Sequence, residues 1–129
     1  MQCYTGYAWA SDSPIRDKWH DAPQETISPI TCTIHIPPTR RPICAQASLT
    51  RFSFTGVAFI WEAKTFVSGY TFHSGAGHQH HSFREDEDTS VAMLNQGLEI
   101  DSVDFTLILR TSVNLSGFAE AGYTVWVIE

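Results

Sequence analysis

The residues best suited to chemistry gather in one stretch of the chain, from His73 to Ser90. It reads HSGAGHQHHSFREDEDTS and holds four of the six histidines, followed by a run of acidic residues. Imidazole and carboxylate groups can bind metals, transfer protons or hydrogen-bond to a sugar. The segments on either side have the residue types of strands. We therefore expect a loop that projects from a β scaffold, where binding residues are commonly displayed.

Metal binding is the first function that this stretch predicts. Side chains alternate along an extended chain, so His78 and His80 share one side, and His81 and Glu85 follow closely in the sequence. Neutral imidazole suits zinc or nickel, and a carboxylate can add a ligand. We expect affinity to fall as the pH drops through about 6.5. Histidines from three subunits around a symmetry axis would complete such a site, and a surface loop without a ligand is the alternative.

The spacing of His78, His80 and Glu85 resembles the first half of the cupin signature, in which two histidines and a glutamate bind a catalytic metal on a β-barrel. The two glycines that flank this half are Phe72 and Ala92 here, and the second half has no counterpart after residue 91. The resemblance implies a metal-binding protein, with a cupin-like metalloenzyme as the minority interpretation.

Hydrolytic catalysis finds little support in the sequence. The G-x-S-x-G motif of a nucleophile elbow does not occur, and no cysteine has the local context of a nucleophile. Four adjacent acids, Glu85 to Asp88, are typical of a solvated charge run. An acid–base site also needs burial to tune its pKa values, and this segment is polar. We predict a protein that is not an enzyme.

Carbohydrate binding requires only aromatic rings against the apolar face of a sugar and polar side chains for its hydroxyls. Several tryptophans and polar loop residues fall outside the core pattern. We expect the sugar-binding residues to come from Trp9, Trp19, Trp61, His73, Arg84 and Asp86. The alternative is structural, because a tryptophan at the end of an apolar run, such as Trp61, can belong to the core.

Composition restricts the class of protein. A chain of 129 residues, with 43% hydrophobic and 17% charged residues, is typical of one globular domain spanning residues 1–129. The formal net charge of -6 argues against a nucleic-acid partner. The longest apolar run, Val57 to Trp61, is far shorter than the roughly 20 residues of a membrane span. Without a signal-peptide pattern, we expect a cytoplasmic protein or one assembled into a virion.

Alternating apolar and polar residues indicate the fold. From Ile30 to Ile36 and from Asp104 to Leu115 the pattern has the period of two that half-buried strands show, whereas only Ile15 to Trp19 suggests a helical turn. We predict an antiparallel β-sandwich, such as a jelly roll, with about six to eight strands and little helix. Its expected core residues are Ile34, Ile36, Leu49, Phe59, Phe105, Leu107, Leu109, Val125 and Val127.

Three cysteines cannot all pair within one chain, and no C-x-x-C spacing suggests a zinc knuckle. Cys32 and Cys44 stand on successive predicted strands and would form a disulfide if those strands paired in register. The alternative, which we favour, is three free thiols that pack as small hydrophobic side chains.

A resemblance to a known family covers about half the chain, and it rests on these residues: Gln2, Gly6 and Trp9, Ile34 to Pro38, Arg41 to Thr50, Val113 to Phe118, and Tyr123 to Trp126. In these segments the chain resembles an H-type lectin domain, a six-stranded sandwich that binds N-acetylgalactosamine-type sugars as a trimer, so an H-type-lectin-like sandwich is a further form that the fold could take. The region from Thr55 to Ser102 is longer than in that family, so no sugar-contacting residue is carried over.

The resemblance implies a homotrimeric recognition module, and we expect its partner to be a glycan or a cell-surface receptor. Similar sandwiches occur at phage-fibre tips and as capsid decoration proteins. A structural component of a virion is therefore the second expected function.

Overall fold

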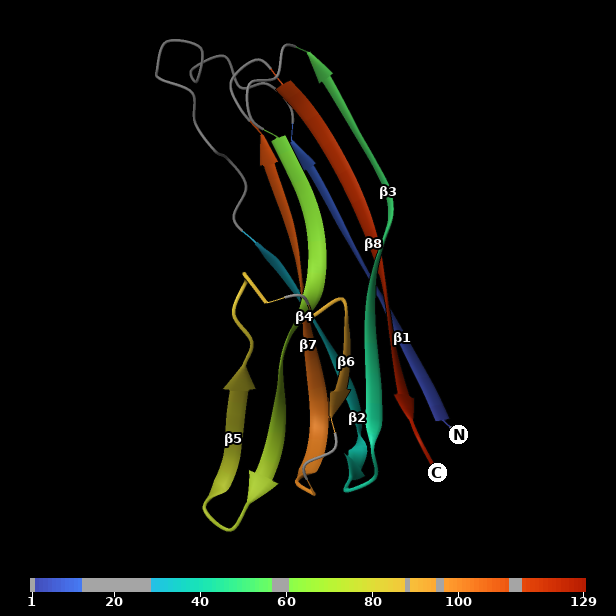
Figure 1. Cartoon of the computed structure of the whole chain (residues 1–129), viewed down its shortest axis with the longest axis vertical. Helices are drawn as coiled ribbons and strands as arrows, with labels where there is room; N and C mark the ends of the chain where they lie inside the picture. The colour runs from blue at the N-terminus through green and yellow to red at the C-terminus, as the bar shows by residue number, and fades with distance from the viewer. Residues whose placement is uncertain (1, 13–28, 57–60, 88, 95–96, 112–114) are drawn as a thin grey trace.

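Two four-stranded antiparallel sheets pack face to face in the computed structural model (Figure 1). The described residues are 2–12, 29–56, 61–87, 89–94, 97–111 and 115–129. Within them, sheet A has the strand order β1-β8-β3-β6 and sheet B the order β2-β7-β4-β5. The strands are β1 Gln2–Asp12, β2 Ile30–Thr39, β3 Ile43–Gly56, β4 Trp61–Ser74, β5 Gly77–Ser82, β6 Val91–Leu94, β7 Glu99–Thr111 and β8 Leu115–Val127.

The strand order identifies the topology. Successive strands alternate between the two sheets, except that β4 and β5 are neighbours in sheet B. This is the order of an eight-stranded jelly roll, which combines two Greek keys. The predicted antiparallel sandwich is confirmed. The described part of the chain contains no helix that could cross a membrane.

The core lies between the sheets and pairs small side chains with large ones. The inner face of sheet A is rich in buried alanine: Ala8, Ala10, Ala45, Ala47, Ala119 and Ala121. Sheet B supplies bulkier buried residues from β7: Val103, Phe105, Leu107 and Leu109. Small residues opposite large ones let the two layers interdigitate at the density of protein interiors.

Most of the predicted core is confirmed. Every predicted core residue within the described ranges is buried, except Leu49, which is partly buried against the core. Phe59 lies outside the described residues, as does the predicted helical turn at Ile15 to Trp19.

One polar group inside the core has its own hydrogen-bond chain. Tyr123 stacks on Phe105 with 4.4 Å between ring centroids. Its hydroxyl lies 2.9 Å from that of Thr65, which is 2.8 Å from the carbonyl oxygen of Thr106. Burial of the phenol raises the pKa of Tyr123 to about 12, because the phenolate would lose its hydration.

One prediction about local structure is wrong. The stretch from His73 is not a loop at its start, because it continues β4 and forms the hairpin strand β5. The three free thiols that we favoured are confirmed, since Cys32 and Cys44 stand in different sheets, on β2 and β3, and all three cysteines are free. Cys3, however, is exposed and does not pack as a hydrophobic side chain.

Irregular pairing in sheet B determines which side chains reach its outer face. In the β4–β7 register, Thr71 pairs with Ser102 but Phe72 pairs with Ile100, so Asp101 is an extra residue in β7. Such a bulge reverses the alternation of side chains beyond it. Ile100 and Val103 are consequently both buried in the core although their numbers differ in parity.

Candidate functional site

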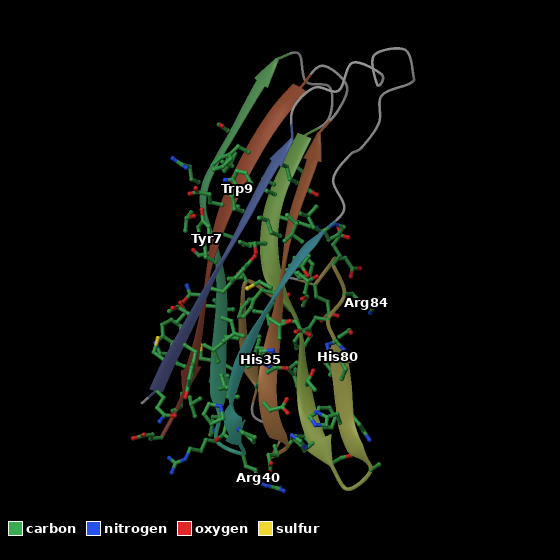
Figure 2. The ribbon with its side chains drawn as sticks, turned by 180° about the vertical axis from the view of Figure 1, so that it is seen from behind. Tyr7, Trp9, His35, Arg40, His80 and Arg84 are labelled. Carbon is green, nitrogen blue, oxygen red and sulfur yellow. The ribbon has the colours of Figure 1, made fainter. Side chains whose placement is uncertain are left out.

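From Tyr7 to Ala10, strand β1 places its two aromatic side chains outward and its two alanines inward. Ala8 and Ala10 are buried, while Tyr7 is 58% and Trp9 54% exposed. The usual strand pattern places large apolar residues in the core, so an exposed aromatic pair on a rigid strand suggests a surface that contacts another molecule. In Figure 2, Tyr7 and Trp9 lie on one side of the sandwich, and His35 and His80 lie toward the other.

A hollow lies beside these aromatic residues on the outer face of sheet A. Its volume is about 350 Å³, within the range of roughly 300–1,000 Å³ that is typical of small-ligand sites. Gly122 of β8 forms part of its floor, between Tyr7 of β1 and Ser48 of β3 in the strand register. Hydroxyl and amide side chains contribute to its lining: Thr5, Gln46, Ser48, Thr50 and Thr124.

The aromatic rings next to the hollow are held by polar contacts. Tyr7 is hydrogen-bonded to the Glu120 carboxylate, which also accepts from Nη2 of Arg51 at 2.7 Å. The Arg51 guanidinium lies 4.8 Å from the ring centroid of Phe118, a cation–π distance. Trp9 meets Phe118 edge to face at 5.8 Å. These contacts restrict the orientation of Tyr7 and Trp9 before any ligand arrives.

The charges in this cluster shift two pKa values in opposite directions. The hydrogen bond from Tyr7, and then Arg51, lowers the pKa of the Glu120 carboxyl. Partial desolvation, and then the neighbouring Glu120, raises the pKa of Tyr7. At neutral pH the pair is therefore a phenol donating to a carboxylate, which is the protonation state that holds the Tyr7 ring in place.

The outer face of sheet B carries a row of hydrogen-bonded polar residues. His80 of β5 crosses over Gly69 of β4 to place Nε2 at 2.6 Å from Oδ2 of Asp104 on β7. Asp104 also accepts from Thr33 of β2 at 2.7 Å, and the Ser82 hydroxyl lies 3.1 Å from His80 Nδ1. The row therefore spans all four strands of sheet B.

Ser82, His80 and Asp104 are the residue types of a hydrolytic triad. Ser82 and His80 are exposed to solvent. Nucleophilic catalysis also needs donors that stabilise an oxyanion away from water. We interpret the row as a structural link, in which the bond to Asp104 fixes the ring of His80 and ties β5 to the centre of the sheet.

A second group of histidines lies at the turn end of the β4–β5 hairpin. His73 and His78 are directly opposite in the register, with ring centroids 4.0 Å apart. Both approach Oδ2 of Asp101, His73 through Nε2 at 2.8 Å and His78 through Nδ1 at 3.6 Å. Their ligand atoms and the Asp101 carboxylate oxygen all lie within 4.8 Å of one another.

The structure does not bring the predicted metal ligands together. His78 joins His73 and Asp101, while His80 bonds to Asp104. His81 faces the other side of β5 and stacks on Tyr70 at 5.1 Å. Glu85 pairs with Lys64 at 3.1 Å. Lys64 precedes His73 by nine residues on β4, a separation of roughly 30 Å along an extended strand.

The predicted sugar-binding residues are also dispersed. Trp9 is on the outer face of sheet A, and His73 is on the outer face of sheet B. Arg84 and Asp86 belong to the exposed turn after β5, where Arg84 contacts Glu87. Trp61 begins β4, but its side chain, like all of Trp19, lies outside the described residues.

Two residues of the candidate sites, Tyr7 and Asp101, are not among those that the sequence predicts. Tyr7 has a readable signal, because it alternates with Ala8 in the same strand as Trp9. Asp101 has none: strict alternation would place Asp101 and Asp104 on opposite faces, and the bulge at Asp101 brings both to the outer face. Bulges are not encoded in a simple hydrophobic pattern.

Comparison of this chain with protein-family models, curated proteins and solved structures finds no match. Functional proposals for the chain therefore rest on its own residues.

Proposed function

We propose that the protein is a non-enzymatic recognition module that binds a carbohydrate in the hollow on the outer face of sheet A. The observation that carries this proposal is a hollow lined by hydroxyl side chains that lies next to two half-exposed aromatic rings, Tyr7 and Trp9. Sugars present an apolar face that stacks on aromatic rings and a rim of hydroxyls that needs hydrogen-bond partners.

The rest of the cluster suits this ligand class. Thr5, Ser48 and Thr124 offer hydroxyls that can both donate and accept, which matches the mixed character of sugar hydroxyls. Arg51 and Glu120 already satisfy each other at 2.7 Å, so they position the aromatic rings without adding net charge. A neutral hollow favours a neutral sugar over an anionic ligand.

The experiment is a glycan array probed with the wild-type protein and with Tyr7→Ala. Tyr7 is exposed, so its removal leaves the core intact, and we expect at least one array signal that Tyr7→Ala reduces about tenfold or more, the loss that one stacked aromatic accounts for. The control is Phe83→Ala, which removes a partly buried ring directly after β5, the edge strand of sheet B. Signals that both variants retain, or an array with no signal, would contradict the proposal.

A second candidate, a structural component of a larger particle, is favoured by the jelly-roll order, which viral capsid proteins share with lectins. Val91 and Met93 of the edge strand β6 are 52% and 58% exposed, and a neighbouring subunit in a trimer would cover them. Light scattering of Met93→Lys against the wild type tests this candidate. Loss of an oligomer together with a silent glycan array would favour assembly over sugar binding.

A further inference from the structure

We propose that His73, His78 and Asp101 form a binding site for a divalent transition-metal ion of the zinc type. The three side chains come from the adjacent strands β4, β5 and β7, and their ligand atoms lie within 4.8 Å of one another. The site is on sheet B, so it is independent of the proposed sugar hollow on sheet A.

The ligand atoms have nearly the separation that a bound ion requires. Zinc bonds of about 2.0–2.2 Å in a tetrahedral arrangement place neighbouring ligand atoms about 3.4 Å apart. Oδ2 of Asp101 is 2.8 Å from Nε2 of His73 and 3.6 Å from Nδ1 of His78. The ligand atoms of His73 and His78 lie within 4.8 Å of each other, so side-chain rotations must shorten this separation by up to about 1.4 Å for all three atoms to bond to one ion.

The hairpin holds the two histidines in register. His73 and His78 are a cross-strand pair, the arrangement that brings side chains of adjacent strands closest. Between them, the Ser74 hydroxyl accepts from the backbone N–H of Ala76 at 3.2 Å and from Nε2 of Gln79 at 3.0 Å. A turn fixed in this way reduces the entropy lost when a metal orders its ligands.

The donor set selects the type of ion. Calcium and magnesium prefer shells made only of oxygen, whereas two imidazoles and one carboxylate suit zinc and its neighbours in the transition series. Three protein ligands leave one position of a tetrahedron open for water or for a group from another molecule. His78 is 62% exposed on its side chain, so that position faces solvent.

The competing interpretation is an ion pair between His73 and Asp101 alone, in which His78 lies nearby but binds nothing. The two interpretations differ in what His78 contributes. An ion pair does not require His78, but a metal site loses a ligand when His78 is removed.

The test is calorimetric titration of ZnCl₂ into untagged, chelator-stripped protein. We expect one ion per chain, and an affinity that His73→Ala, His78→Ala and Asp101→Asn each weaken at least about tenfold. The matched controls are His80→Ala, two residues along the same face of β5, and His35→Ala on β2 of the same sheet; both should retain wild-type affinity. Co²⁺ bound in place of zinc should give the intense visible absorption of a four-coordinate site.

Circular dichroism of each variant checks that it is folded. If Asp101→Asn does not fold, the zinc affinity of His78→Ala still tests the proposal, because the His78 side chain is exposed and its removal leaves the core intact. The proposal is overturned if wild-type protein shows no saturable binding of zinc, or if His80→Ala and His35→Ala weaken binding as much as His78→Ala does.

Discussion

Replacing the strand glycines Gly69 and Gly122 by alanine should change the free energy of unfolding in opposite directions. Neither has a positive φ, so backbone conformation permits alanine at both positions. The difference lies in the space that the added methyl group meets. At Gly122 the nearest atom is Cγ2 of Thr50 at 3.5 Å, an ordinary contact. At Gly69 the methyl carbon would lie 2.5 Å from the carbonyl oxygen of His81 and 3.0 Å from the ring of His80.

The expected magnitudes follow from these distances. Gly122→Ala should raise the free energy of unfolding by about 0.4–1 kcal/mol, because alanine restricts the unfolded chain without straining the folded one. Carbon–oxygen contacts shorter than about 3.3 Å are uncommon, so Gly69→Ala must push β5 away by about 0.8 Å. Overpacking of this kind costs about 1–3 kcal/mol. It also displaces His80 from Asp104, so the net effect is destabilising.

The assay is urea unfolding of both variants and the wild type, followed by tryptophan fluorescence. We expect a higher urea midpoint than that of the wild type for Gly122→Ala and a lower one for Gly69→Ala, with similar slopes. Gly122→Ala also narrows the sugar hollow, so it should weaken carbohydrate binding while it stabilises the fold. The reasoning is refuted if Gly69→Ala is as stable as the wild type, or if Gly122→Ala is the less stable of the two.

Three further predictions concern other parts of the fold. Absorbance titration should show a tyrosine that ionises only near pH 12 and is absent from Tyr123→Phe. The pKa of Tyr123 in the folded protein lies above the value of about 10 in the unfolded chain. The stability that the protonated phenol contributes is therefore fully present below about pH 10 and is lost as the pH rises through about 12. Asp104→Ala leaves the hydroxyl of Thr33 and the ring of His80 without their shared acceptor. Because both groups are exposed to water, urea unfolding should show a loss of about 0.5–1.5 kcal/mol. Glu85→Gln removes the charge of the surface ion pair with Lys64, so it should lower the free energy of unfolding by less than about 1 kcal/mol and leave zinc affinity unchanged; a larger effect on either quantity would contradict the assignment of Glu85.

The strands could be predicted from the sequence where burial of one face requires apolar and polar residues to alternate. From Ile30 to Ile36 one face of the strand must be apolar, and the structure buries Ile34 and Ile36 as predicted. The strand β5 lacked such a signal, because GHQHHS is exposed along its whole length at the edge of sheet B. An edge strand without a buried side has the polar composition of a loop, so the hairpin was predicted as one.

The candidate sites were less accessible, because each combines residues from strands that are distant in the sequence. His78 was predicted from its own spacing, but its partner Asp101 depends on the register of β4 with β7 and on a bulge. The hollow depends on Gly122 lying between β1 and β3 in sheet A. His80, His81 and Glu85 are close in the sequence, which suggested a shared metal site. In the structure, His80 and His81 face opposite sides of β5, and Glu85 lies in the turn that follows.

The most direct test of the central claim is a two-dimensional amide NMR titration of the labelled protein with a sugar identified on the array. We expect chemical-shift changes concentrated on the outer face of sheet A, at Thr5, Ser48 and Thr124 around Gly122, and the indole signal of Trp9 should move at the same sugar concentrations. Shift changes that cluster instead at His73 and His80 on sheet B would contradict it.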